Sequence, residues 1–359
     1  MKISLLLVFF LPLIGLSQRS KLQAGFDKEE FIEMLKISSY QGDSLYNPDL
    51  KAPEKYKKTY RSETMGLENR WDLWQSNDSI AVISIRGTTA EKSSWLENLY
   101  SAMVPAQGSL KLSKDFIFNY ELCNDKKAGV HTGWLIATAY LSRDILPKID
   151  SLQKTGIREF IIMGHSQGGA IAYLLTAHFK SLQKQQTLSS AVVFKTYCSA
   201  APKPGNLHFA YAYEHLTSGG WAFNVVNSAD WVPEVPFSIQ TTMDFNATNP
   251  FSTAKKSMKK APFFQRIAMK HVYNSLDKPT KKANKKFQKK LGRTLGKIIS
   301  KTLPEFENPR YFNSFNYART GVHIVLYADS DYYSIFPDIP GEIWTHHAFE
   351  PYLYLMEKY

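Results

Sequence analysis

The residues of this chain whose types and spacing best suit chemistry form the pentapeptide Gly164-His165-Ser166-Gln167-Gly168. The apolar run 160–163 comes directly before it, so the sequence predicts a strand that turns abruptly into a helix. Strand and helix can approach closely there, because the glycines carry no β-carbons. Such a turn would project the Ser166 hydroxyl as a nucleophile.

A serine hydroxyl needs a general base and a group that orients the base, commonly a histidine and a carboxylate. Behind a turn of this kind the partners follow in the order Ser, Asp, His. Asp230 fits the second place, since 225–227 reads as a strand end and 228–233 as the loop at its carboxyl edge. The alternative is that Asp230 is a surface aspartate that caps a turn.

His346 and His347 are the candidates for the base, because they follow the last predicted strand and precede the last predicted helix. Their position after Ser166 and Asp230 distinguishes them from the other histidines, which we interpret as structural. Those residues are His131, His165, His178, His208, His215, His271 and His323.

The elements that would position these residues alternate between strand and helix, which predicts an α/β fold. The predicted strands are 80–86, 159–163, 191–197, 221–226 and 321–327, with an extended segment at 116–122, and the predicted helices are 131–152, 167–183 and 347–358. A further helix begins after Asp27 as its cap, and a polar connector follows over 41–61. We therefore expect an N-terminal helix and connector over 18–61 and one catalytic domain over 62–359.

The first residues have the composition of a secretory signal, with Lys2, an apolar stretch and a small-residue cleavage site after Ser17. We expect residues 1–17 to be removed and the protein to be secreted, or to lie in the periplasm or cell envelope. The alternative is a membrane anchor, but the apolar run is short for a bilayer span and Pro12 interrupts it.

The chain contains two cysteines, Cys123 and Cys198, which we expect to be free thiols, since Cys198 ends a buried apolar run. No spacing of Cys, His, Asp or Glu is typical of a metal site, so we expect neither a metal nor another cofactor.

The net charge of +12 is concentrated in one part of the chain. Residues 251–301 contain sixteen Lys or Arg and a single acid, Asp277, so the rest of the chain is slightly acidic. Within this part, 281–303 predicts a basic amphipathic helix, with apolar residues on one side and lysines on the other.

Several further motifs, together with the serine turn, resemble those of the class 3 lipases, which are fungal lipase-like α/β-hydrolases. The similar segments are ISIRGT at 83–88, WLENL at 95–99, VHTGW at 130–134, APKPGN at 201–206 and VNSADWVP at 226–233. The resemblance implies an α/β-hydrolase fold with a mostly parallel central sheet flanked by helices. It also implies a lid over 90–100 and lipid esters as substrates.

Carried over residue by residue, the resemblance makes Ser166 the nucleophile, Asp230 the triad acid and His347 the base. It favours His347 over His346 because the family's histidine commonly has a tyrosine five residues later, here Tyr352. The oxyanion hole would use the backbone N–H groups of Thr88 and Gln167.

The chain departs from compact members of the family by a basic helical insertion at about 251–308, between the acid and the histidine. One interpretation is that helix 281–303 docks on an anionic membrane or lipid interface. The other is a cap helix packed on the hydrolase body with a solvated basic face. We expect no nucleic acid partner, since no recognisable module is present.

The sequence thus predicts a secreted serine ester hydrolase, either a triacylglycerol lipase or phospholipase A1-like. The alternatives are a non-catalytic lipid- or envelope-binding protein on the same scaffold and, less well supported, a serine peptidase. The oligomeric state is left open.

Overall fold

The computed structural model describes residues 21–41 and 50–359. The predicted signal peptide, residues 1–17, and its cleavage site lie outside these ranges. None of the helices within them has both the length and the apolar character required to cross a bilayer.

A seven-stranded sheet forms the centre of the described structure, in the order β1-β2-β3-β8-β9-β11-β13. From β3 to β13 neighbouring strands are parallel, whereas β1, β2 and β3 pair antiparallel at one edge. The strands are β1 (Tyr56–Arg61), β2 (Trp71–Ser76), β3 (Ile80–Ile85), β8 (Glu159–His165), β9 (Val193–Ser199), β11 (Ala222–Asn227) and β13 (Val322–Leu326). This mostly parallel sheet confirms the predicted α/β-hydrolase class.

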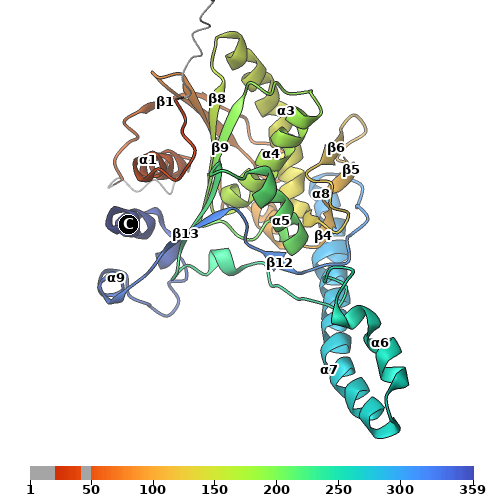
Figure 1. Ribbon diagram of the computed structural model, residues 1–359. Coiled ribbons are helices and arrows are strands. Elements are labelled where there is room, and N and C mark those ends of the chain that lie inside the picture. The colour runs from red at the N-terminus through yellow and green to blue at the C-terminus, as the bar shows by residue number, and fades with distance from the viewer. Residues whose placement is uncertain (1–20, 42–49) are drawn as a thin grey trace, which may run out of the picture.

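Helices cover both faces of the sheet (Figure 1). On one face lie α3 (Thr132–Lys154), α4 (Gln167–Lys184) and α5 (Leu207–Leu216), and on the other α1 (Lys28–Ser39) and α10 (Phe349–Lys358). The middle of strand β8, residues 160–163, is apolar because it serves both cores. Phe160 and Ile162 pack toward α3 and α4, while Ile161 and Met163 pack toward α1 and α10.

The N-terminal segment is more closely joined to the sheet than its polar composition indicates. Asp27 caps α1, as expected, and accepts a hydrogen bond from the Glu30 N–H. The end of the predicted connector is strand β1, which pairs with β2 at the edge of the sheet. Its lysines are typical of an exposed edge strand, where charge discourages pairing with another chain.

Smaller elements surround the central sheet. A four-stranded sheet contains β4 (Met103–Pro105), β7 (Gly129–His131), β10 (Gly205–Asn206) and β12 (Tyr317–Ala318), and a two-stranded sheet contains β5 (Gln107–Lys111) and β6 (Ile117–Glu121). The short helices are α2 (Lys92–Leu99), η1 (Val232–Glu234), α9 (Ser330–Ile335) and η3 (Thr345–His347).

The basic insertion is helical, and part of it projects from the body (Figure 1). It consists of α6 (Pro250–Lys260), α7 (Phe263–Phe287), a π-helical segment (Gln288–Thr294) and α8 (Leu295–Thr302). Helix α6 and the first half of α7, together residues 250–276, form the projecting hairpin. Within 281–303, the apolar residues Leu291, Leu295 and Ile299 pack on the body, which agrees with the cap-helix interpretation of this segment.

Candidate active site

Ser166 occupies a strained turn between β8 and α4. Its backbone has φ 60° and ψ −132°, which a non-glycine residue rarely adopts. A β-carbon on Gly164 would collide with the backbone of Gly168, and one on Gly168 with the carbonyl of Ile85. The two glycines therefore permit the tight packing that holds Ser166 at the carboxyl end of β8.

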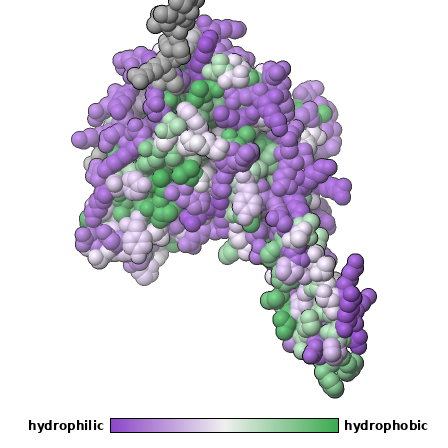
Figure 2. Space-filling model, viewed as in Figure 1, coloured by the Kyte–Doolittle hydropathy of each residue, from purple (hydrophilic) through white to green (hydrophobic). Residues whose placement is uncertain are grey.

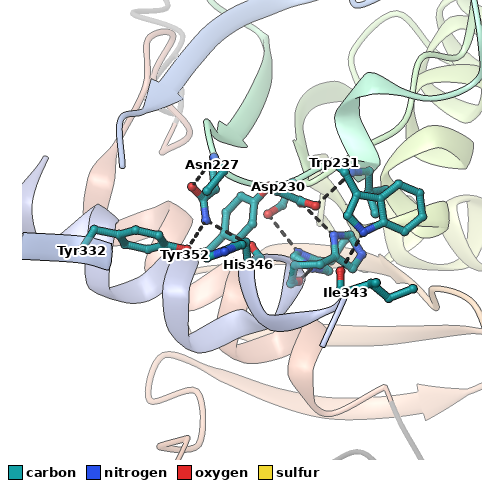
Figure 3. Close-up of polar contacts among 12 residues, drawn as sticks. Asn227, Asp230, Trp231, Tyr332, Ile343, His346 and Tyr352 are labelled. Carbon is teal, nitrogen blue, oxygen red and sulfur yellow. Dashed lines mark hydrogen bonds and ion pairs between the residues drawn. The ribbon is translucent and has the colours of Figure 1, made fainter. Parts of the chain in front are cut away.

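Asp230 and His347 lie in direct contact. The Nδ1 atom of His347 is 2.7 Å from Oδ2 of Asp230, and the Tyr352 hydroxyl donates to the same oxygen at 2.8 Å (Figure 3). The other carboxylate oxygen accepts the Val232 N–H at 3.0 Å. Burial, followed by the charge of Asp230, raises the pKa of Tyr352 well above its usual range, so its phenol stays protonated and donates.

His346 points elsewhere, although it is the neighbour of His347. Its Nδ1 lies 2.7 Å from the Tyr332 hydroxyl and its Nε2 lies 2.9 Å from Asp338. Asn227 ties this region to the end of β11 by donating to the Tyr332 hydroxyl and to the carbonyl of His346 (Figure 3). The structure thus brings His347, and not His346, to Asp230.

The second ring nitrogen of His347, Nε2, is left without a hydrogen bond in the described structure, although it is buried. Because Nδ1 donates to Asp230, Nε2 of the neutral ring is left as an acceptor. It is the atom of this residue that can take a proton.

His165 fixes the backbone of the histidine loop to the serine turn. Its Nε2 donates to the carbonyl of His347 at 2.9 Å, and its Nδ1 lies 3.1 Å from the Ser199 hydroxyl. Burial, with a smaller effect of His347, lowers the pKa of His165 to about 3, so it stays neutral. Its role is structural, as the sequence indicated for this residue.

Thr88 and Gln167 lie in one hydrogen-bonded network that includes helix α2. The Asn98 side chain donates to the Thr88 hydroxyl at 2.9 Å and accepts from the Trp134 indole at 3.0 Å. Gln167 is the first residue of α4, a position whose N–H has no intrahelical acceptor. The N–H of Thr88 likewise has no acceptor among the described residues.

Glu97 is a member of this network that the sequence did not single out as functional. Its carboxyl group is fully buried and accepts from the side-chain amides of Asn69 and Gln167, at 2.7 Å each. Burial raises its pKa to about 8, against a smaller opposite effect of the two amides. The sequence signal for such a partner was Gln167 directly after the nucleophile, because a buried side-chain amide requires a hydrogen-bond partner.

Helix α2, which the resemblance implied to be a lid, has one side held against the body. Ser94 and Glu97 are buried, and the Ser94 hydroxyl donates to the Gln167 side chain at 3.2 Å. The opposite side exposes Trp95 and Leu99. In this conformation the inner side of α2 is therefore part of the wall around the serine turn.

Three tryptophans form a half-exposed aromatic rim beside the histidine. Trp344 lies between Trp95 and Trp231, with ring centroids 6.0 and 5.1 Å away, and its ring is 5.7 Å from that of His347. The Trp231 indole donates to the carbonyl of Ile343 at 2.7 Å (Figure 3). Rings that are apolar and yet have a polar tip suit a boundary between water and an apolar phase.

The remaining candidate ligands form no metal centre in the described part of the chain, where no group of three or more His, Cys, Asp or Glu residues could hold an ion. Both cysteines are free, with Cys198 buried and Cys123 half-buried.

Part of the chain is similar to known lipases. Residues 82–240, which include Thr88, Ser166 and Asp230, match the family described as Lipase (class 3). This segment of the chain is therefore similar to the class 3 lipases. His347 lies outside the matched residues.

The chain is also similar to individual lipases. It is 27% identical over 139 residues to secreted mono- and diacylglycerol lipase 1 of Fusarium solani, a match over 37% of this chain and 39% of that relative. The match thus spans about two fifths of the relative's length. Among solved structures, it is similar to the triacylglyceride lipase of Rhizomucor miehei (19% identity, 60% and 77% of the two chains, TM-score 0.44) and to lipase II of Rhizopus niveus (19%, 58% and 74%, TM-score 0.43).

Proposed function

We propose that the protein is a serine carboxylic-ester hydrolase that acts on lipid esters through Ser166, His347 and Asp230. The observation that carries the proposal is the contact of His347 with Asp230 at 2.7 Å, which leaves Nε2 buried and free beside the strained turn of Ser166. A buried imidazole nitrogen without a partner costs free energy. Among the described residues Nδ1 of His178 is also buried without a partner, but His347 is the one of the two whose other nitrogen contacts a buried carboxylate.

The proposed reaction is acyl transfer in two steps. Nε2 of His347 takes the proton of the Ser166 hydroxyl as the serine oxygen attacks the ester carbonyl, and the protonated ring then gives this proton to the departing alcohol. Asp230 stabilises the charged ring and, with Tyr352, holds its orientation. Water then releases the acid from the acyl-serine by the same proton transfers, and the free hydroxyl is restored.

The developing oxyanion would be stabilised by the backbone N–H groups of Thr88 and Gln167. Asn98 supports the N–H of Thr88 by holding the side chain of that residue. Glu97 supports the N–H of Gln167 by accepting a hydrogen bond from its side-chain amide. Loss of one oxyanion donor costs about 10²–10³ in rate in other enzymes, so the network behind these groups should matter for turnover.

Lipid esters are the proposed substrates because of the tryptophan rim and the family of residues 82–240. Triacylglycerol lipase and phospholipase A1-like activities both remain candidates, and the basic insertion favours anionic or phospholipid surfaces. The solvated lysines of 281–303 would attract such a surface, although the apolar side of this segment packs on the body. Secretion through the predicted signal is part of the proposal, and the Fusarium relative is described as secreted.

Substitution of the nucleophile tests the proposal. Ser166→Ala should lower kcat for a short soluble ester by on the order of 10⁶, as for other serine triads, because no alternative nucleophile replaces it. The matched control is Ser181→Ala, which removes a half-buried hydroxyl near the other end of α4 and should leave turnover unchanged.

A fluorophosphonate probe should label the wild-type chain at Ser166 only. Absence of labelling in the folded protein would contradict the proposal and favour the non-catalytic alternative. Near-wild-type hydrolysis by Ser166→Ala would exclude this serine as the nucleophile.

A further inference from the structure

The projecting hairpin of α6 and the first half of α7 exposes large apolar side chains that do not contribute to the core. Phe264 is 83% exposed and Phe263 is 60% exposed at the start of α7, at the tip of the hairpin. Ile267, Met269, Val272 and Leu276 follow along the helix and are also exposed. In Figure 2 hydrophobic colour covers the tip and one side of this projection, and hydrophilic colour covers the opposite side.

The same hairpin is strongly basic. Residues 250–276 contain six Lys or Arg and no Asp or Glu. Within the described ion pairs, Lys256, Lys259, Lys260, Arg266 and Lys270 have no acidic partner. Arg266 instead lies over the ring of Phe263, 5.7 Å from its centroid. The hairpin therefore combines free apolar surface with positive charge that the protein itself does not neutralise.

The rest of the insertion does not share this property. In 281–303 the apolar side packs on the body, where Ile299 is fully buried. Asp277 marks the base of the hairpin: it accepts from Thr242 at 2.6 Å and pairs with Lys281 at 2.8 Å. Ile298, at 39% exposure, is the exposed large apolar residue of 281–303. Most of the apolar surface that the insertion leaves available for a partner therefore lies on the hairpin.

The hairpin also connects directly to the candidate site. The segment 235–249 joins η1, which follows Asp230 at the carboxyl end of β11, to the start of α6. Phe237, in this segment, packs against Phe287 of α7 with ring centroids 6.4 Å apart. The chain thus passes from Asp230 to the start of the hairpin within about twenty residues.

We propose that the hairpin 250–276 docks the protein on an anionic phospholipid bilayer, with Phe263 and Phe264 entering the interface. A bilayer fits the surface because exposed rings can enter the headgroup region while the flanking cations meet anionic lipid. A protein partner with an apolar groove fits this surface less well, because such a groove would not require six basic residues with no acidic residue among them. The inference rests on the proposed function, since it assigns the lipid surface that the site would meet.

Vesicle flotation of the full mature chain carrying Ser166→Ala tests the inference without lipid degradation. Vesicles of phosphatidylcholine with phosphatidylglycerol should bind the protein, and vesicles of phosphatidylcholine alone should bind it weakly. Phe263→Ser with Phe264→Ser should weaken binding to the anionic vesicles by about tenfold or more, because two apolar rings no longer enter the interface. The matched control is Tyr211→Ser, a similarly exposed aromatic residue on α5, which should bind as before.

A charge comparison locates the surface. Two double variants each remove two positive charges. One, Lys259→Gln with Lys260→Gln, changes the hairpin. The other, Lys285→Gln with Lys286→Gln, changes the end of α7 next to the packed helix. The first pair should weaken binding more, and high salt should weaken all binding. Unchanged binding of the phenylalanine variant, with its unfolding midpoint unchanged, would overturn the inference, as would equal losses for the two lysine pairs.

Hydrolysis of a soluble short ester by the wild-type chain is measured in parallel. Its absence would contradict the proposed function, whereas hairpin-dependent binding to vesicles would then still be observed. The two failures are therefore distinguishable.

Discussion

Two adjacent histidines, His346 and His347, have different partners and consequently different chemistry. His347 contacts the buried Asp230 and leaves Nε2 free, whereas both nitrogens of His346 are engaged, by Tyr332 and by the exposed Asp338. To accept the proton of an attacking hydroxyl, a ring nitrogen needs a lone pair that no other group of the protein occupies. This difference makes His347 our proposed base.

The pair provides a matched test at the residue scale. His347→Ala should lower kcat for a soluble ester by about 10⁶, as in other serine hydrolases. His346→Ala should retain most of the activity and lose about 1 kcal/mol of stability for its hydrogen bonds. Steady-state kinetics of both variants decide the matter, and a larger loss of kcat in His346→Ala would exclude our assignment.

Glu97 is a buried acid whose ionisation is coupled to folding. Its pKa is about 8 in the folded chain, against an ordinary value of 4.5, because burial disfavours the carboxylate. Below about pH 4.5 the group is neutral in both states and its burial costs no ionisation energy. Between these two values the unfolded chain releases a proton that the folded chain retains, so stability falls as pH rises.

Glu97→Gln should remove this pH dependence. For the wild-type chain this single group lowers the free energy of unfolding by about 1.4 kcal/mol per pH unit between about pH 4.5 and about pH 8. At low pH Glu97→Gln should be less stable than the wild-type chain, because its own amide group faces the amide donors of Asn69 and Gln167. As pH rises, it should lose less stability than the wild-type chain. Denaturant unfolding of both proteins from pH 5 to pH 8 measures the difference, and parallel curves would contradict a neutral Glu97.

At the scale of elements, the helix from α7 through α8 changes character along its length. Its first half projects with α6, and its second half packs on the body through Gly292 and Gly296. In the second half the glycines allow the helix backbone to approach Ala102, Tyr100 and Asn308. Both glycines are unfavourable in an isolated helix, so their presence indicates close packing.

Gly296→Ala distinguishes a packed helix from a free one by the sign of its effect. In a free helix the change should stabilise by about 1 kcal/mol. Here the added methyl group overlaps the Asn308 side chain, so we expect a loss of about 1–3 kcal/mol. Lys297→Ala, on the exposed side of the same turn, should stay within about 0.5 kcal/mol. Thermal and denaturant unfolding measure both, and a stabilised Gly296→Ala would contradict the packing.

Over the whole molecule, the candidate site is assembled from distant parts of the chain. Thr88 follows β3, Ser166 follows β8, Asp230 follows β11 and His347 precedes α10, and β3, β8 and β11 are parallel. Parallel strands direct their carboxyl ends to one edge of a sheet, so residues far apart in the sequence meet there. The hairpin of α6 and α7 is added to this arrangement without disturbing it.

Much of this arrangement could be predicted from local sequence. The apolar run before Gly164 indicated β8, the glycines indicated the tight turn, and Asp27 was a correct helix cap. Strand β1 could not be predicted in this way, because an edge strand buries few side chains and its polar residues resemble a connector.

The sequence by itself determined the fold class, the serine turn and the basic character of the insertion, since each depends on residue types at short spacing. Only the tertiary structure decided which histidine meets Asp230, that Glu97 lies buried behind Gln167, and which half of the insertion keeps its apolar surface free. These outcomes depend on contacts between segments far apart in the chain. Periodicity shows that a helix has an apolar side, but the partner of that side is set by how the whole chain packs.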